Sequence, residues 1–277
     1  MSVTPSDFEY VRDLIHQRAG IVLEQGKEYL VESRLGPLAE KEGFGSLAEY
    51  LGRLQRDTFN GSHRKLIHAM TTNETLFFRD IRPFELLRSR IIPELIAARA
   101  SERYLTFWSA ACSTGQEPYT IAMTLREYFP QLQGWNLRII ASDLSTDVLA
   151  RAIRGRYTQL EVNRGLPVQF LVKYFNRDGD DWQIREEIRR MIEFREMNLT
   201  EAWSFLPKID VVFMRNVLIY FNQETKRKIL SKVAPLISAS GFLFLGSAET
   251  TLTIAEEFEP LPGVAGGCYR LKRPKLP

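Results

Sequence analysis

Apolar residues in the first seventy positions recur at the three- and four-residue spacing of amphipathic helices. These sets predict helices over residues 8–15, 30–38, 47–54 and 62–70. Pro5 opens the first helix and Gly43 follows the second, as helix starts and ends require. Ser46 and Glu49 fit a capping box in front of the third helix. This part of the chain is therefore expected to be all-α.

From about residue 104 the pattern changes to short apolar stretches that alternate with amphipathic segments. Strands are predicted over residues 104–108, 137–143, 192–194, 209–213, 241–245 and 268–271. Helices are expected between them, and one begins at Asn222 as its cap and runs to about Ile237. Such alternation indicates a mostly parallel sheet covered on both faces. Ligands of these sheets bind beyond the carboxyl ends of the strands.

Residues 154–190 interrupt this alternation with a polar stretch. The turn-forming run 176–181 lies at its centre, between short segments at 170–175 and 182–184. An inserted antiparallel subdomain fits this pattern, and a long loop of the same composition fits it as well.

Composition and charge narrow the class of protein. The chain has 277 residues, of which 44% are hydrophobic and 26% charged, as in ordinary globular proteins. A net charge of +3 is too small to indicate a nucleic-acid partner. Cys112 and Cys268 stand far apart, so no disulfide framework is expected.

Two further expectations follow from what the sequence does not contain. No apolar run approaches the ~18 residues of a membrane-spanning helix, and the N-terminus lacks a signal-peptide pattern. We therefore expect a cytoplasmic protein without membrane insertion. The histidines at 16, 63 and 68 do not have metal-ligand spacing, so no metal is expected.

Candidate chemistry gathers where predicted strands end. Small residues at 109–115 allow a sharp turn and close approach of a ligand, and Glu117 follows them. Asp143 ends the next strand, where an acid can accept hydrogen bonds from cofactor hydroxyls. Arg215 and Asn216 directly follow a further apolar strand, with Tyr220 close behind. A tight turn, solvated acids and a core tyrosine are the alternative interpretation of these residues.

Several segments together resemble the CheR family of chemotaxis receptor methyltransferases. The matching segments are Thr72–Arg79, Trp108–Tyr119, Ala141–Asp143, Asn198–Leu199 and Arg215–Phe221. The resemblance implies a Rossmann-like class I methyltransferase domain with a mixed, mostly parallel seven-stranded sheet. It also implies a small inserted antiparallel β-subdomain and an all-α N-terminal domain. The implied divisions are a receptor-docking domain at 1–72, a linker and cofactor-contacting helix at 73–103, and the methyltransferase domain at 104–277, with the insertion at about 156–190.

The resemblance also implies a site for S-adenosylmethionine or its product S-adenosylhomocysteine. The implied contacts are Asn73, Thr75, Arg79, Glu117, Asp143, Asn198, Leu199, Arg215 and Asn216. Asp143 would take the ribose hydroxyls, and Asn198 with Leu199 would border the adenine. Arg79 and Tyr220 would face the transferring methyl and the incoming receptor glutamate.

The implied partners are the glutamate-rich methylation helices of chemoreceptors. Candidate docking cations in the N-terminal domain are Arg53, Arg56, Arg64 and Lys65, although a solvated helix face explains them equally. Some family members tether a receptor C-terminal pentapeptide through the inserted subdomain. The turn at 176–181 looks shorter here, so tethering is not expected. A monomer is the simplest expectation.

A receptor glutamate has a pKa near ~4.3 and is ionised at neutral pH, so methyl transfer to it requires no general base. Alignment and exclusion of water remain for the enzyme to supply. Two other functions stay open at this point. One is a methyltransferase for another protein or a small molecule, and the other is a non-catalytic sensor of the cofactor.

Overall fold

The N-terminal part of the chain forms a helical domain with its own hydrophobic core. A computed structural model describes residues 3–264 and 266–272. The helices of this domain are α1 (Pro5–Ala19), α2 (Glu28–Lys41), α3 (Leu47–Arg56) and α4 (Gly61–Ala69). Val11, Ile15, Val31, Leu35 and Leu51 are fully buried between them. The four predicted helices are confirmed.

The capping box predicted at the start of α3 forms only in part. The Ser46 hydroxyl accepts a hydrogen bond from the Glu49 N–H at 3.2 Å. The Glu49 carboxylate accepts from the Gly45 N–H at 3.1 Å instead of from Ser46. The helix start is therefore capped, but its reciprocal bond lies one residue earlier than predicted.

The rest of the described chain is built around a seven-stranded sheet with the order β6-β2-β1-β7-β8-β10-β9. Its strands are β1 (Tyr104–Ala110), β2 (Asn136–Asp143), β6 (Ile192–Glu196), β7 (Ile209–Met214), β8 (Ile237–Leu245), β9 (Phe258–Pro260) and β10 (Cys268–Leu271). The pairs from β6 to β8 are parallel, and β10 pairs antiparallel with both β8 and β9. The predicted mixed, mostly parallel sheet is confirmed. The edge strand β9 was not predicted because only three residues form it.

Adjacent residues of each central strand point to opposite faces of the sheet and contribute to different hydrophobic cores. Phe107 belongs to the core beneath α7 (Gln116–Tyr128) and the helical residues 82–98. Trp108 belongs to the core beneath α12 (Gln223–Val233). The helices and helical turns around the sheet are α5 (Arg82–Leu86), η1 (Leu87–Ile91), α6 (Ile92–Ala98), α7 (Gln116–Tyr128), η2 (Pro130–Leu132), α8 (Thr146–Arg154), η3 (Leu218–Tyr220), α12 (Gln223–Val233) and η4 (Ala234–Leu236). Helices on both faces of the sheet bury the apolar side chains of its strands.

Helix α12 begins as predicted and ends earlier than predicted. The Asn222 side chain accepts a hydrogen bond from the Thr225 N–H at 2.8 Å, which caps the helix. The helix ends at Val233 rather than near Ile237, where β8 already begins. Pro235 explains the difference, because proline has no N–H to continue the helix.

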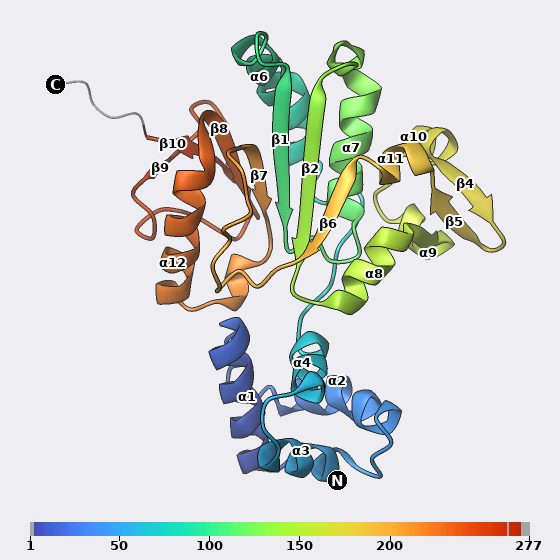
Figure 1. Ribbon diagram of the computed structural model, residues 1–277, viewed down its shortest axis with the longest axis vertical. Helices are drawn as coiled ribbons and strands as arrows, with labels where there is room; N and C mark the ends of the chain where they lie inside the picture. Colours follow the sequence, from blue (N-terminus) through green and yellow to red (C-terminus); the bar gives the residue numbers. More distant parts are fainter. Residues whose placement is uncertain (1–2, 265, 273–277) are drawn as a thin grey trace.

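The irregular stretch forms a small antiparallel subdomain rather than a loop (Figure 1). Its strands are β3 (Arg156–Thr158), β4 (Phe175–Asp178) and β5 (Asp181–Ile184), in the order β3-β5-β4. Short helices accompany them: α9 (Gln159–Asn163), α10 (Val168–Tyr174) and α11 (Glu186–Arg189). Gly179 and Asp180 alone separate β4 from β5, so the central turn is tight.

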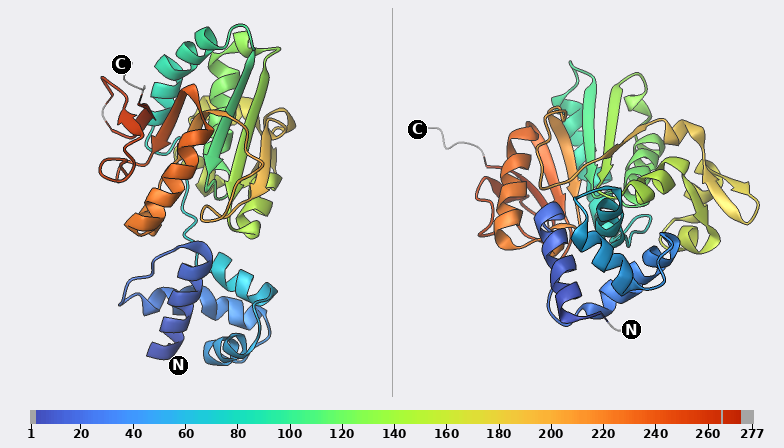
Figure 2. Two further views of the ribbon diagram at one scale, coloured as in Figure 1. Left: turned by 60° about the vertical axis from the view of Figure 1, so that its left-hand side comes forward. Right: turned by 60° about the horizontal axis from the view of Figure 1, so that its bottom comes forward.

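The helical domain lies against the sheet edge at which β1 and β2 end (Figure 1), and Figure 2 shows this from two further sides. Ile21 forms an antiparallel bridge with Phe221, and the Val22 N–H donates to the Tyr220 carbonyl at 2.9 Å. Gly20 ends α1 with φ of 71°, and a Cβ there would meet a methyl carbon of Thr200 at 2.7 Å. The two domains therefore meet at the ligand-binding edge of the sheet.

Candidate active site

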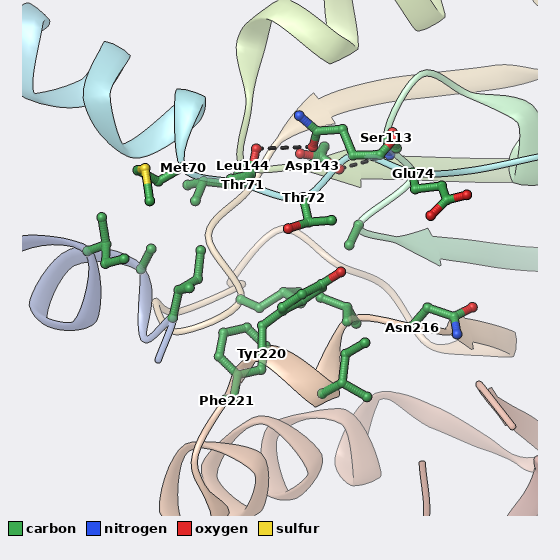
Figure 3. A pocket seen from close by; sticks show the side chains of 18 of the residues that line it. Met70, Thr71, Thr72, Glu74, Ser113, Asp143, Leu144, Asn216, Tyr220 and Phe221 are labelled. Carbon is green, nitrogen blue, oxygen red and sulfur yellow. Dashed lines mark hydrogen bonds between the residues drawn. The ribbon is translucent and has the colours of Figure 1, made fainter. Parts of the chain in front are cut away.

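A cavity of about 480 Å³ opens between the carboxyl edge of the sheet and the helical domain. We call Glu117, Asp143 and Arg215 its floor, and Ile21–Leu23, Lys27 and Arg34 its N-terminal wall. In Figure 3, Asp143 and Ser113 lie on one side, and the Tyr220 ring projects from the other side toward the space between them. Segments from both domains therefore enclose a single site.

The turn after β1 follows a path that few residues tolerate. Ala111, Ser113 and Gly115 have φ of 56°, 50° and 95°. A Cβ on Gly115 would meet the Cβ of Ala152 at 2.9 Å, so only glycine fits. Burial raises the pKa of the Cys112 thiol, which keeps it protonated within this turn. The small residues singled out in the sequence thus bring the backbone close to the cavity.

Asp143 is a buried carboxylate at the end of β2, with 7% of its surface exposed. Its oxygens accept hydrogen bonds from the Ser113 N–H at 2.8 Å and the Ser145 N–H at 2.9 Å. Burial raises the pKa of this carboxyl above its usual value, although these hydrogen bonds act in the opposite direction. An acid held in this way has lone pairs left for hydrogen-bond donors in the cavity.

Glu117 and Arg215 form a buried ion pair on the floor. Arg215 Nη1 lies 3.0 Å from Glu117 Oε2, and the Arg215 side chain is 1% exposed. Arg215 Nη2 also donates to Asp80 Oδ2 at 2.7 Å and to the Arg79 carbonyl at 2.9 Å. Burial raises the pKa of Glu117, and Arg215 opposes that rise. Arg215 is therefore a fixed part of the floor.

Arg79 belongs to a segment with strained backbone. Phe78, Asp80 and Ile81 have φ of 50°, 66° and 38°, which costs about 1–3 kcal/mol per residue. Arg79 Nη1 donates to the Glu74 carbonyl at 2.8 Å, and the side chain is half-buried at the cavity. Asn73 and Thr75 line the cavity from the same segment.

The remaining predicted contacts line the same cavity from the loops after β6 and β7. The Asn198 amide donates to the Arg18 carbonyl at 2.7 Å and accepts from the Thr200 N–H at 3.0 Å, so it links the two domains. Leu199 is buried beside it. Tyr220 is half-buried and lines the cavity, and its hydroxyl makes no hydrogen bond to another described residue. Every residue that the sequence assigned to cofactor or chemistry thus lines one cavity, including Asn216.

The predicted docking cations lie elsewhere. Arg53 pairs with Asp57 at 2.9 Å and Lys65 pairs with Glu42 at 2.6 Å, on the surface of α3 and α4. Arg64 lines a second cavity between the domains. Lys27 and Arg34, which sequence reasoning missed, line the main cavity instead. Lys27 is the N-cap residue of α2 and Arg34 lies within that helix, and nothing in the sequence set them apart from other surface cations.

Two negative findings concern the described residues. None of their helices combines the length and apolar character that a bilayer crossing requires. Among the same residues, no group of three or more His, Cys, Asp or Glu side chains could hold a metal ion.

Residues 73–265 match the family model described as CheR methyltransferase, SAM binding domain, and residues 6–71 match CheR methyltransferase, all-alpha domain. The fold and the site therefore define an S-adenosylmethionine-dependent methyltransferase. More particularly, the chain belongs to the CheR family and is a chemotaxis protein methyltransferase.

Relatives match over nearly the whole chain. It is 42% identical over 277 residues to Chemotaxis protein methyltransferase 1 of Pseudomonas aeruginosa, with 98% of this chain and 100% of the relative covered. It is 40% identical over 276 residues to Chemotaxis protein methyltransferase Cher2 of Pseudomonas putida, with the same coverage. A solved structure, PKMT2 from Rickettsia typhi, is more distant at 15% identity and a TM-score of 0.38, covering 63% of this chain and 26% of that one.

Proposed function

We propose that the protein transfers a methyl group from S-adenosylmethionine to glutamate side chains of chemoreceptors. The products are glutamyl methyl esters and S-adenosylhomocysteine, and the role is sensory adaptation in the cytoplasm. The observation that carries this proposal is the cavity, in which Asp143 on the floor lies opposite Tyr220 between the two domains.

The floor fits a nucleoside-containing donor. Asp143 is buried with lone pairs to spare, and the turn after β1 brings backbone close to the cavity. In our proposal Asp143 accepts from the ribose hydroxyls, while Asn198 and Leu199 border the adenine. Asn73, Thr75, Glu117, Arg215 and Asn216 complete the enclosure. The donor supplies a methyl group on a positively charged sulfur, which the cavity must align and keep dry.

The acceptor side requires orientation more than proton transfer. A glutamate is ionised at neutral pH, so no base has to remove a proton. Arg79 can hold the carboxylate, but a tight bidentate grip would stabilise a charge that disappears as the ester forms. We therefore propose that Arg79 orients the acceptor. The Tyr220 hydroxyl, which has no hydrogen bond to another described residue, contributes one weaker hydrogen bond.

Docking of an acidic receptor helix is proposed to use cations of the helical domain. Arg53, Arg56, Arg64 and Lys65 provide an outer positive field that raises the rate of encounter. Lys27 and Arg34 provide positive charge at the cavity itself. We propose that the protein acts as a monomer. We also propose that it docks without a pentapeptide tether, because the β4–β5 turn of the inserted subdomain is tight.

Methyl label distinguishes this function from its alternatives. The protein is incubated with radiolabelled S-adenosylmethionine and receptor cytoplasmic fragments, and label is measured before and after mild base. Base-labile label on the receptor supports the glutamyl ester. Base-stable label indicates another acceptor group, and absence of label together with donor binding indicates a cofactor sensor. Receptor fragments with glutamine in place of the methylated glutamates are the matched control.

A further inference from the structure

Glu249 is a buried acid with no role so far in donor or acceptor binding. It has 8% of its surface exposed and follows the end of β8 by four residues. Within the described part of the chain, no lysine, arginine or histidine pairs with it. A carboxylate buried without a cation is costly unless other groups satisfy it.

Four backbone N–H groups satisfy this carboxylate. Oε2 accepts from Gly246 at 2.6 Å and from Asn216 at 2.8 Å. Oε1 accepts from Val217 at 2.9 Å and from Ile219 at 3.3 Å. Hydrogen bonds to an ionised acceptor are stronger than neutral ones, so the arrangement holds these backbone groups firmly.

The carboxylate joins two loops that leave neighbouring strands. Met214 at the end of β7 is in register with Leu245 at the end of β8. Asn216 has φ of 57°, a conformation that needs support from its surroundings. A Cβ on Gly246 would meet Asn216 Nδ2 and Glu249 Oε2, both at 2.8 Å. The two loops are therefore packed too closely for any side chain at Gly246.

We propose that Glu249 is a positioning residue for methyl transfer. Its carboxylate accepts hydrogen bonds from the N–H groups at the start of η3, and η3 ends at Tyr220. It thereby holds the Tyr220 hydroxyl where it faces the cavity. The carboxylate itself does not line that cavity and touches neither donor nor acceptor. This inference rests on the proposed function, because the effect of Glu249 is measured as a change in the rate of methyl transfer, to which Tyr220 contributes.

The test is a double-mutant cycle of Glu249→Gln with Tyr220→Phe. Glutamine turns one acceptor oxygen into an NH₂ group that meets two N–H donors. Each single variant is expected to lower kcat about 10-fold, the upper range for one neutral hydrogen bond. The double variant is also expected to be about 10-fold slower rather than 100-fold, because the two changes remove the same contact. The exposed Glu256→Gln is the matched control and keeps the wild-type kcat.

Donor affinity and thermal unfolding of the same variants separate positioning from general damage. Positioning predicts a donor Kd within about 3-fold of wild type, with the loss confined to kcat. An additive cycle, or an equal loss in donor affinity and kcat, overturns the inference. If Glu249→Gln does not fold, Glu249→Asp enters the cycle in its place, because it keeps the charge but draws the carboxylate one methylene away from the four N–H groups. Absence of receptor methylation by the wild-type protein contradicts the proposed function instead.

Discussion

The floor of the cavity and its N-terminal wall are organised differently. On the floor, Asp143 and Arg215 are buried, the Glu117 side chain is 13% exposed, and hydrogen bonds from several segments hold all three. On the N-terminal wall, Lys27 and Arg34 are half-buried cations in and beside a surface helix. A rigid floor suits a donor that never varies, because its polar groups need no rearrangement when it binds. A charged wall of half-buried side chains suits acceptors that differ in sequence but share negative charge.

The largest effect is expected from breaking the ion pair of the floor. Arg215→Met leaves Glu117 buried without its cation, and the free energy of unfolding is expected to fall by about 3–5 kcal/mol. The double variant Arg215→Met with Glu117→Gln is expected to recover part of that loss, since the only acid left without its cation is Asp80, whose side chain is 43% exposed. Urea unfolding of the wild-type protein, Arg215→Met, Glu117→Gln and the double variant measures both effects. A loss below about 1 kcal/mol in Arg215→Met would show that the floor is not rigid.

Asp143→Asn tests the floor as a donor site. Replacing charge-assisted hydrogen bonds by neutral ones is expected to weaken donor binding about 10- to 100-fold in calorimetry. The exposed Asp147→Asn is the matched control. Equal affinities in the two variants would remove Asp143 from the donor site.

Titration of the Asp143 carboxyl is expected to change the stability of the fold and the affinity for the donor in opposite directions. Because burial raises its pKa in the folded state, its contribution to stability is present at low pH. That contribution is lost as the pH rises from about 3.9, the ordinary value, through the raised pKa. Donor binding requires the ionised form and strengthens over the same window. Asp143→Asn is expected to remove this part of both pH profiles.

The junction between floor and wall is tested at Gly20. Alanine there has an unfavourable φ of 71° and a Cβ 2.7 Å from Thr200, whereas Gly26 has φ of 82° with open space around it. Gly20→Ala is expected to destabilise the protein by about 1 kcal/mol more than Gly26→Ala, through overlap alone. Thermal unfolding compares them. Equal stabilities would mean that the domains separate easily at this contact.

Tyr220→Phe tests the side of the cavity opposite Asp143, where the acceptor is proposed to enter. Loss of one neutral hydrogen bond is expected to lower kcat by up to about 10-fold and to leave donor affinity nearly unchanged. Steady-state kinetics with a receptor fragment and donor titration provide the two readouts. Tyr128→Phe, at the far end of α7, serves as the control. Unchanged turnover in Tyr220→Phe would remove this hydroxyl from the mechanism.

The smallest effect is expected at the outer surface of the helical domain. Charge reversal of Arg53 and Arg56 to glutamate is expected to slow receptor methylation about 3-fold at low salt, and less at high salt. Arg190→Glu breaks a similar i, i+4 pair in the β-subdomain and controls for that loss. An unaffected rate at low salt would confine docking to Lys27 and Arg34.

The sequence predicted the sheet and singled out residues that line the cavity, but it could not show which surface cations are already paired. Asp143 and Arg215 could be located because they directly follow apolar strands, whose carboxyl ends converge. Glu249 escaped notice because it acts on backbone N–H groups, which leave no mark in the sequence. The sequence could not show that Arg53 and Lys65 pair with acids, because Lys65 pairs with Glu42, 23 residues away; their role in docking stays a prediction. Pairing of this kind depends on tertiary contacts.

The bridge between Ile21 and Phe221 has a consequence for biosynthesis. The helical domain leaves the ribosome early and carries its own core, but the strand ends that complete the site lie some two hundred residues later. Donor binding must therefore await almost the entire chain. A truncated or stalled product that ends before β7 would contain the N-terminal helices but lack Arg215, Asn216 and Tyr220 of the site.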